Sequence, residues 1–297
     1  MHFCTFYLSG QYQLGAAQDE NCLFISNLSA NWPSDNPPQT ILDLIHLGEE
    51  GLEIANNLRN TSKEWINVED VKWVSPIPRL QKNIFCVGRN YREHIIEGNI
   101  AQGRDPNLFP THIELFSKAT TTVIGHKDTI PSHKDITKML DYEAELAIVI
   151  GKRGSNISAE EADEFIFGYT ILNDVTGRDI QRLHGQWFKG KSLDGSCPIG
   201  PWIVNKSVIS NPNGLGIRLW VNDELRQNSN TSTMIFSVQK IISELSAGLT
   251  LEPGDIIATG TPCGVGYAMK PPQPLKKGDL ISIEIDLIGR LENIVGD

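Results

Sequence analysis

Two acidic residues at the start of a long apolar run constrain this chain more than any other feature. Residues 141–145 read Asp-Tyr-Glu-Ala-Glu and continue into Leu-Ala-Ile-Val-Ile. A β-strand places alternate side chains on one face, so Glu143 and Glu145 point the same way, about 7 Å apart along the backbone. Two carboxylates against a buried sheet repel each other and lose hydration, so they need compensation. A divalent cation provides it, and oxygen ligands favour Mg²⁺, Mn²⁺ or Ca²⁺. The alternative is a solvated strand end with both acids in water.

The composition is that of an ordinary globular protein, and it excludes several classes of function. The 297 residues are 40% hydrophobic and 21% charged, with a formal net charge of −10. This acidic balance argues against nucleic acid or an anionic membrane surface as the main partner. No apolar run reaches the ~18 residues that span a bilayer, and the N-terminus lacks a signal-peptide pattern. Five scattered cysteines without a Cys-x-x-Cys pair predict neither a disulfide framework nor a zinc site, so we expect a cytoplasmic location.

The chain divides into two parts by composition. Residues 1–72 contain short strand and helix patterns without a catalytic cluster, and they predict a small N-terminal α+β domain. Residues 73–80 include Pro76 and Pro78, which fix φ and remove backbone donors, as in an extended linker. The remainder, 81–297, is rich in strands without regular βαβ alternation. The predicted fold class is therefore α+β and β-rich, with mixed, mainly antiparallel sheets.

Hydrophobic patterns predict individual elements within the larger part. Helical patterns cover 90–98 and 236–247, and Ser158 with Glu161 forms a capping box that predicts a helix through Phe165. Asn222-Asp223 is typical of a hairpin turn. Strands are predicted at 83–88, 113–117, 121–130, 143–151, 167–173, 256–259 and 280–287.

A histidine and a glutamate follow the first of these strands, in the segment Gly88-Arg-Asn-Tyr-Arg-Glu-His-Ile-Ile-Glu97. His94 and Glu97 are three residues apart and hence neighbours on one helical face. A carboxylate beside an imidazole orients the ring and raises its basicity, as a general base for water requires. The alternative is a surface pair on an amphipathic helix, and the spacing alone favours that simpler interpretation.

Asp174 stands where the strand at 167–173 ends, which is a common position for ligands. Arg178 and Gln181 follow four and seven residues later, and a short helix would place all three on one face. Arg178 could then bind a substrate carboxylate through two hydrogen bonds, and Gln181 a carbonyl or hydroxyl group. The alternative is a capped helix with Asp174 near its N-terminus.

Two further segments carry candidate groups. Lys189 and Lys191 lie among aromatic and small residues, and a partly buried ammonium could stabilise a developing oxyanion, but spacing cannot choose between the two. The glycine-rich segment Thr259-Gly-Thr261-Pro-Cys-Gly-Val-Gly266 could hold an anion through its backbone N–H groups. It lacks the Gly-Lys-Ser/Thr ending of a phosphate-binding loop.

Glu284 and Asp286 repeat the spacing of the first acid pair on another predicted strand. No His–carboxylate pair or glycine-rich segment adjoins them. We therefore expect these two acids to be structural and to bind no metal.

Taken together, these segments resemble the fumarylacetoacetate hydrolase superfamily from about Asn83 to the C-terminus, with each motif in the family's order. The resemblance is closest to two-domain bacterial members, which include oxaloacetate decarboxylases and acylpyruvase-type proteins. It rests on Gly88-Arg-Asn-Tyr91 with His94 and Glu97, Asp141-Tyr-Glu-Ala-Glu145, Asn173-Asp174 with Arg178 and Gln181, Lys191 with Cys197-Pro198, and Thr259-Gly-Thr-Pro262.

The resemblance implies a mixed β-roll or sandwich, usually a homodimer, with residues 1–72 as an extra N-terminal domain. It implies that Glu143, Glu145 and Asp174 hold Mg²⁺ or Mn²⁺, with Ca²⁺ as an alternative occupant in crystals. It further implies catalytic roles for a His94–Glu97 dyad on a mobile lid and for Lys191 in preference to Lys189. The substrate-binding residues by this resemblance are Arg178, Gln181 and Thr261.

One departure from the family pattern narrows the substrate. In the resemblance, true fumarylacetoacetases carry a further acidic ligand about seven residues before the histidine, and that place here is near Val87. The site therefore resembles the three-carboxylate version that handles small 2-oxo acids. Three carboxylates with one Mg²⁺ would leave a net charge of −1 and positions open to substrate.

The expected function is metal-dependent C–C bond cleavage in a 2-oxo or 2,4-dioxo acid, by a lyase or a hydrolase. Decarboxylation of oxaloacetate and hydrolysis of an acylpyruvate share an enolate that a metal ion stabilises, and we place decarboxylation first. One alternative is an isomerase or tautomerase of an unsaturated 2-oxo dicarboxylate, similar to 2-hydroxyhepta-2,4-diene-1,7-dioate isomerase. The other is a non-catalytic binding protein on the same fold.

Overall fold

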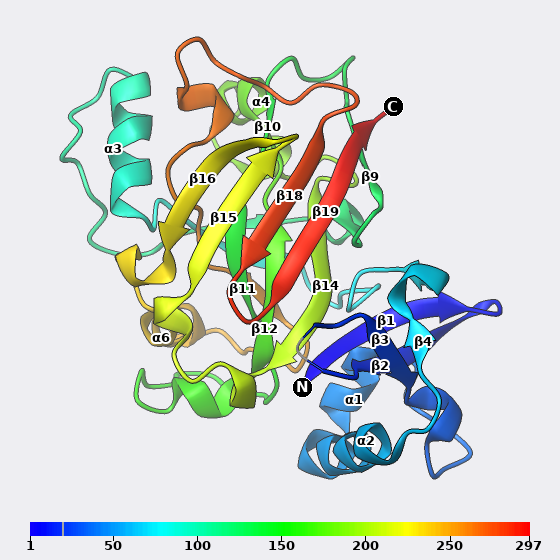
Figure 1. The fold of residues 1–297 in the computed structure, drawn as a ribbon. Helices are drawn as coiled ribbons and strands as arrows, with labels where there is room; N and C mark the ends of the chain where they lie inside the picture. Colours follow the sequence, from blue (N-terminus) through cyan, green and yellow to red (C-terminus); the bar gives the residue numbers. More distant parts are fainter. Residues whose placement is uncertain (20) are drawn as a thin grey trace.

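A twelve-stranded mixed sheet runs through the whole molecule in the computed structural model, which describes residues 1–19 and 21–297 (Figure 1). The strand order is β4-β3-β2-β1-β14-β12-β11-β17-β6-β7, with β5 beside β1 and β8 beside β14. Its strands are β1 (His2–Leu8), β2 (Gln11–Ala17), β3 (Phe24–Asn27), β4 (Ile66–Asn67), β5 (Lys72–Trp73), β6 (Ile84–Gly88), β7 (Glu114–Lys118), β8 (Val123–Ile124), β11 (Ala144–Ile150), β12 (Ile166–Asn173), β14 (Cys197–Asn205) and β17 (Ile256–Ala258).

A five-stranded sheet packs face to face on β11, β12 and β14 and stands in front of them in Figure 1. The order is β16 (Glu224–Asn230), β15 (Gly216–Val221), β18 (Leu280–Ile285), β19 (Gly289–Gly296) and β9 (Thr129–Pro131). The alternating side chains of β15 and β18 that face inward, such as Leu219 and Ile283, join the main core between the sheets. A separate two-stranded pair, β10 (Leu140–Asp141) with β13 (Thr176–Gly177), adjoins the ends of β11 and β12.

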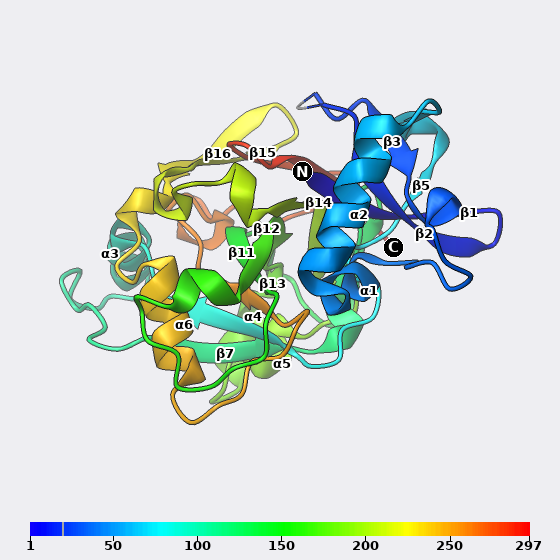
Figure 2. The same ribbon diagram turned by 90° about the horizontal axis from the view of Figure 1, so that it is seen from below.

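Helices α1 (Ile41–His46) and α2 (Gly48–Thr61) pack against the N-terminal strands β1 and β2, and the other helices lie around the larger part of the molecule (Figure 2). These other α-helices are α3 (Arg92–Ala101), α4 (Arg178–Leu183), α5 (Phe188–Lys191) and α6 (Val238–Ser246). Thr40 and Asp43 form a reciprocal capping box at the start of α1, and the Ser237 hydroxyl accepts a backbone hydrogen bond at the start of α6. None of the helices in the described part of the chain is long and apolar enough to cross a membrane.

The β-rich α+β fold class and its mainly antiparallel pairing are confirmed, but two predicted elements are wrong. Residues 121–130 do not form one strand, because the chain leaves β8, which pairs with β14, and turns through Lys127 (φ 65°) before β9, which pairs with β19. The capping contacts between Ser158 and Glu161 exist, yet only a 3₁₀ turn at Ala162–Phe165 follows them, because β12 begins at Ile166.

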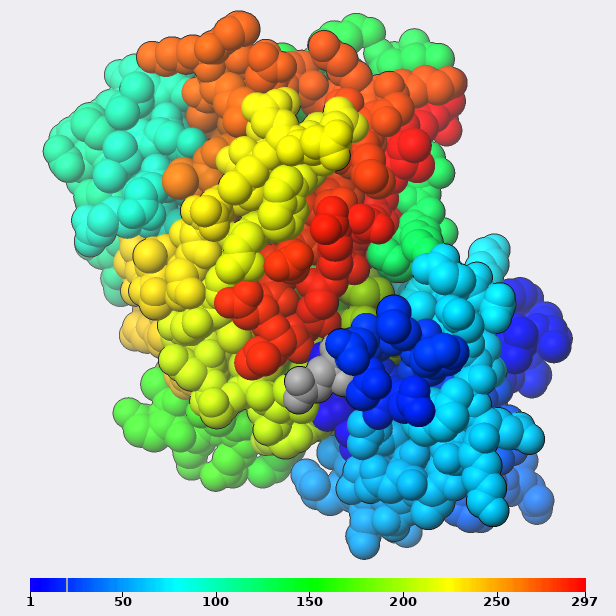
Figure 3. Space-filling model, viewed as in Figure 1, coloured from blue at the N-terminus to red at the C-terminus, as the bar shows by residue number. Residues whose placement is uncertain are grey.

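Strands β1–β4 and helices α1 and α2 lie within residues 1–72 and pack around Phe3, Leu14 and Leu44. The same hydrophobic cluster also includes Val149 and Phe167 from the larger part of the chain. This part is nevertheless continuous with the large sheet, since β1 pairs with β14 through His2 opposite Val204. In Figure 3 the N-terminal part, in blue, lies beside the C-terminal hairpin, in red. The division into domains at 1–72, 73–80 and 81–297 therefore stays a prediction.

Candidate active site

Three carboxylates converge where β11 begins and β12 ends. The antiparallel register sets Ala144 opposite Asn173, and the Asp174 N–H donates to the Glu143 carbonyl at 2.9 Å. One oxygen from each of Glu143, Glu145 and Asp174 lies within 4.8 Å of the others. The three residues are 5%, 1% and 0% exposed. The acids predicted to form a cluster are therefore brought together, with two supplied by alternation along one strand and one by its antiparallel neighbour.

Two cations pair with the first of these acids. Lys191 Nζ lies 2.7 Å from Glu143 Oε2 and 2.6 Å from Asp174 Oδ2, while Arg178 Nη1 lies 2.7 Å from Glu143 Oε1. Burial alone would raise the pKa of Glu143, but Lys191 and Arg178 outweigh burial and hold this pKa below its usual range. Burial would likewise lower the pKa of Lys191, but Asp174 and Glu143 raise it, so Lys191 is a cation rather than a base.

Glu145 lacks such compensation. Its only hydrogen bond among the described residues comes from the Gly260 N–H, at 2.7 Å to Oε2. Burial raises the pKa of Glu145 well above its usual value, and the charges of Asp174 and Glu143 raise it further. Gly260 has φ +99°, and a Cβ there would lie 2.9 Å from Asn90 Cβ, so a glycine is needed for this close approach.

The cluster fits a hard divalent cation. It offers only carboxylate oxygens, which suit Mg²⁺ and Mn²⁺ better than soft metals. Asp174 Oδ1 is buried and accepts no hydrogen bond among the described residues. Glu145 is buried without a cationic hydrogen-bond partner, so the donor set retains both charge and lone pairs for an ion.

A buried lysine forms an ion pair with Asp174, and the sequence analysis did not predict this role. Lys118 is fully buried at the end of β7, and its Nζ lies 2.8 Å from Asp174 Oδ1. Its ammonium protons are directed instead to the carbonyls of Val175 and Lys191 and to the Ser196 hydroxyl. A lysine at a strand end gives no local signal of such a role, because its partners are distant in sequence.

Asp141 is a second residue whose role the sequence did not predict. Its carboxylate accepts hydrogen bonds from Arg178 Nε at 2.9 Å, from the Gly266 N–H at 2.8 Å and from the Tyr267 N–H at 3.1 Å. It therefore ties the start of α4 to the glycine-rich loop.

Asp141 and the buried cations change the expected charge of the site. Four carboxylates now face three cations, namely Lys118, Arg178 and Lys191, which leaves one negative charge in excess when all are ionised. The excess of −1 expected with a divalent ion bound is therefore wrong. A divalent ion would leave the group at +1, which favours an anionic substrate.

The predicted dyad is formed on α3. His94 Nδ1 lies 2.9 Å from Glu97 Oε1, and the Gly264 N–H donates to both Glu97 oxygens at 3.1 and 3.0 Å. Gly264 has φ +101°, and a Cβ there would lie 1.9 Å from the Arg226 carbonyl. Because Glu97 holds Nδ1, the other ring nitrogen, Nε2, is left for a substrate.

The predicted substrate-binding residues differ in how many of their hydrogen-bonding groups are already engaged by other side chains. Arg178 Nε and Nη1 are engaged by Asp141 and Glu143, and only Nη2 is without a partner among the described residues. Gln181 Oε1 lies 3.4 Å from Arg178 Nη1. The Thr261 hydroxyl accepts from Gln227 Nε2 at 2.9 Å, and Gln227 comes from β16, outside every predicted motif. The expectation that Asp174 shares a helical face with Arg178 and Gln181 is wrong, because α4 begins only at Arg178.

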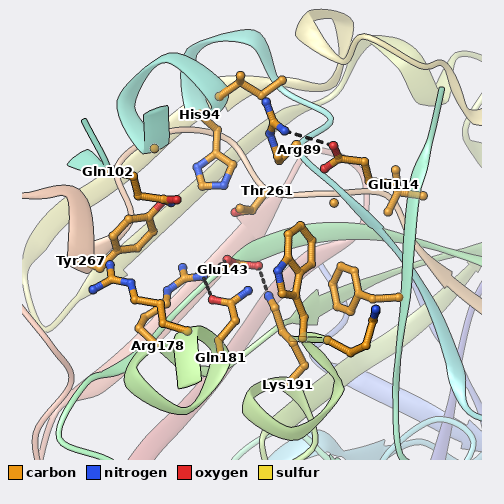
Figure 4. Close-up of a pocket in the computed structure, with 18 of the residues that line it drawn as sticks. Arg89, His94, Gln102, Glu114, Glu143, Arg178, Gln181, Lys191, Thr261 and Tyr267 are labelled. Carbon is orange, nitrogen blue, oxygen red and sulfur yellow. Dashed lines mark hydrogen bonds and ion pairs between the residues drawn. The ribbon is translucent and has the colours of Figure 1, made fainter. Parts of the chain in front are cut away.

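A cavity of about 710 Å³ brings these groups together (Figure 4). His94 points into it from α3, opposite Glu143 and Lys191. Lys189 is exposed, so the structure separates it from Lys191. Two predicted site residues do not line the cavity but contact residues that do. Glu97 contacts His94, and Asp174 contacts Lys191. The predicted site residues that line the cavity are His94, Glu143, Glu145, Arg178, Gln181, Lys191 and Thr261.

Glu284 and Asp286, the acid pair expected to be structural, lie away from this cavity and form ion pairs with an arginine. Arg218 Nη1 lies 3.3 Å from Glu284 Oε1 and 3.0 Å from Asp286 Oδ1, on the exposed face of the five-stranded sheet. Among the described residues, only Glu143, Glu145 and Asp174 form a group of three such ligands close enough for one ion.

Comparisons with known proteins identify the family. The family described as fumarylacetoacetate (FAA) hydrolase, C-terminal, matches residues 83–296. The chain is 46% identical over 267 residues to oxaloacetate tautomerase YisK of Bacillus subtilis, covering 87% of each chain. It is 39% identical over 273 residues to the mitochondrial oxaloacetate tautomerase fahd2 of Xenopus laevis, covering 91% of this chain and 82% of the relative.

A solved structure agrees along the whole length. The fumarylacetoacetate hydrolase from psychrophilic Exiguobacterium antarcticum superposes with a TM-score of 0.84 at 38% identity, covering 100% of this chain and 99% of that one. The chain therefore belongs to the fumarylacetoacetate hydrolase family, as the sequence motifs indicated, and it is an enzyme of that family.

Proposed function

We propose that this enzyme interconverts the keto and enol forms of oxaloacetate or a close 2-oxo dicarboxylate, with Mg²⁺ or Mn²⁺ held by Glu143, Glu145 and Asp174. The observation that carries the proposal is the cavity in which the His94–Glu97 dyad faces the buried carboxylate cluster. The two relatives named as oxaloacetate tautomerases support this order of reactions. Decarboxylation, which the sequence placed first, therefore becomes the second candidate.

A divalent ion bound to the carboxylates would act as a Lewis acid towards a 2-oxo acid. The chain's own groups would then move protons. Keto–enol exchange takes a proton from C3 and places one on the C2 oxygen. His94 lines the cavity, and its Nε2 has no hydrogen-bond partner among the described residues. Glu97 holds the imidazole in one orientation through its contact with Nδ1.

Lys191 would stabilise the charge that develops on the C2 oxygen. Its ammonium has three N–H donors, of which two are directed to Glu143 and Asp174. The third has no hydrogen-bond acceptor among the described residues, so it would be available to a substrate oxygen, with the Phe116 ring centroid 4.9 Å from Nζ. Since Lys191 stays protonated, it supplies a positive charge and does not compete with His94 as the base.

Decarboxylation of oxaloacetate is the second candidate, because it needs the same charge stabilisation at the C2 oxygen but no base. Hydrolysis of an acylpyruvate is the third, and it would use the dyad to activate water. The substrate in every case is a small 2-oxo acid.

A homodimer and a cytoplasmic location also stay predictions. Light scattering on the purified protein would test whether it is a homodimer.

One experiment separates these candidates. Purified protein with Mg²⁺ or Mn²⁺, and with EDTA, is given enol oxaloacetate, keto oxaloacetate and an acylpyruvate, and enol loss, CO₂ release and acid release are followed. We expect metal-dependent enol–keto exchange to be fastest in kcat/KM. Faster CO₂ release or acid release would reverse the order, and an inert protein on all three would favour a non-catalytic binding role.

A further inference from the structure

The cavity contains an arginine that none of the roles above uses. Arg182 is on α4, four residues after Arg178, and it is exposed where it lines the cavity. It makes no hydrogen bond or ion pair with any described side chain, and its one ring contact is with Tyr267, at 5.4 Å from the guanidinium carbon to the ring centroid. Its charge is thus uncompensated.

The ring of Tyr267 connects this arginine to the carboxylate cluster. The guanidinium carbon of Arg178 lies 4.5 Å from the same ring centroid. Asp141 fixes both partners, because its Oδ2 accepts from Arg178 Nε and from the Tyr267 N–H. Arg182 therefore lies next to the reaction site, on a platform whose position is set by buried hydrogen bonds.

The hydroxyl end of the Tyr267 side chain lies against helix α3. A Cβ on Gly98 would lie 2.8 Å from the Tyr267 hydroxyl oxygen, so the ring reaches the backbone of the helix that carries His94. Figure 4 shows Gln102, the C-cap residue of the same helix, beside the Tyr267 ring. The ring thus forms one wall of the cavity between α3 and α4.

The other cavity arginines are less suited to a second substrate anion. Arg178 is paired with Asp141 and Glu143, and Arg89 with Glu114 at 3.0 Å. Arg104 makes no ion pair with another described side chain, but it follows α3 on an exposed loop. Of the arginines that line the cavity in the described part of the chain, Arg182 alone combines an uncompensated charge with a contact to the Asp141–Tyr267 platform.

We propose that Arg182 binds the distal carboxylate of a 2-oxo dicarboxylate, against the ring of Tyr267. The inference rests on the proposed function, because it assumes that the 2-oxo acid end lies at the carboxylate cluster. A guanidinium binds a carboxylate through two parallel hydrogen bonds, and stacking on a ring restricts its orientation. With a divalent ion bound, the cluster at +1 and Arg182 together match the two negative charges of such a substrate.

Calorimetry with Mg²⁺-saturated protein tests this directly. Pyruvate has the 2-oxo acid end alone, whereas 2-oxoglutarate and 2-oxoadipate add a distal carboxylate at two chain lengths. We expect the wild-type protein to bind at least one diacid more tightly than pyruvate. Arg182→Met should weaken that diacid on the order of tenfold, about 1.4 kcal/mol, while pyruvate changes less than about twofold. Arg182→Lys keeps the positive charge but loses the paired donors of the guanidinium. Its affinity for the diacid should fall between those of wild type and Arg182→Met.

Two matched variants serve as controls. Arg153 is an exposed arginine paired with Glu252 at 3.0 Å, and Arg153→Met should leave all affinities unchanged. Arg104→Met should also leave the preference for diacids intact. The proposal is overturned if Arg182→Met leaves diacid binding unchanged, if it weakens pyruvate and diacid equally, or if Arg104→Met removes the preference instead. A wild-type protein that binds no 2-oxo acid at all would overturn the proposed function as well.

Discussion

The acid pair on β11 and the acid pair at the end of β18 have the same spacing but different surroundings. Glu143 and Glu145 are buried beside Asp174, whereas the side chains of Glu284 and Asp286 are 40% and 45% exposed. Each pair has an arginine, Arg178 or Arg218. The difference teaches that period-two spacing does not make a metal site. The metal site that we propose on β11 also has burial and a third acid from the neighbouring strand, which leave its carboxylates with less compensation than the exposed pair.

The largest expected effect concerns the dyad, which only the β11 site has. His94→Ala should lower kcat for enol–keto exchange on the order of 10²–10⁴-fold, the usual range for general acid–base catalysis. Glu97→Ala should do the same, and the double variant should be little worse than either single variant, since the two groups share one task. Steady-state kinetics of the four proteins checks this, and fully additive losses would show that the groups act independently.

His94→Ala should also damage oxaloacetate decarboxylation less than tautomerisation, because loss of CO₂ needs no base. Product analysis on the same protein preparation gives both rates. Equal losses in both reactions would mean that His94 acts through binding or structure and not through proton transfer.

The two arginines should differ in their effect on stability. Arg178→Met leaves Asp141 and Glu143 buried without this partner, and breaking a buried pair costs about 3–5 kcal/mol. Arg218→Met removes an exposed pair and should cost roughly 0–1 kcal/mol. Urea unfolding in EDTA, monitored by circular dichroism, measures both. Similar losses for the two variants would mean that the sites do not differ in effective burial.

The glutamates should differ in metal binding. Glu145→Gln replaces a charged ligand with a neutral one and should weaken Mn²⁺ on the order of 100-fold, as changes in a metal site commonly do. Glu284→Gln is the matched control and should leave Mn²⁺ affinity unchanged. Calorimetric titration with Mn²⁺ decides the matter, and wild-type affinity in the Glu145→Gln protein would show that the ligand assignment is wrong.

A smaller effect separates stability from metal binding. The pKa of Glu145 is raised in the folded state, so this carboxyl supports folding below its unfolded pKa of about 4.3, and that support is lost as pH rises through the folded pKa. In EDTA at neutral pH, Glu145→Gln should therefore melt a few degrees higher than wild type, at roughly 2–4 °C per kcal/mol. The difference should vanish in acid. A wild-type protein that melts higher at neutral pH in EDTA would contradict this reasoning.

Local patterns in the sequence predicted which acids share a face and which residues contact each other, whereas the ligand set and the role of the dyad came from the family resemblance. Alternation predicted a common face for Glu143 and Glu145, and a spacing of three predicted the contact between His94 and Glu97, because both rules involve neighbouring residues on one element. The strand end at Asn173 predicted the position of Asp174 but not its distance from Glu143. That distance follows from the antiparallel register of β11 and β12.

The supporting residues could not be predicted, because their contacts join distant segments. Lys118 meets Asp174 across 56 positions of sequence, and Gln227 meets Thr261 from the other sheet. Asp141 stands in the motif that opened the argument, yet its role depends on Arg178 and on the loop at Gly266. The error in the expected charge of the site has a different cause, because the charges of Lys118 and Asp141 cancel each other. It arises because a count of three carboxylates leaves out the two cations Arg178 and Lys191.

Anomalous scattering from crystals soaked in Mn²⁺ tests most directly whether burial and a third acid, and not spacing, define the metal site. We expect a peak within bonding distance of Glu143, Glu145 and Asp174, and none beside Glu284 and Asp286. A peak at Glu284 and Asp286, or the absence of one at the β11 cluster, would contradict that conclusion.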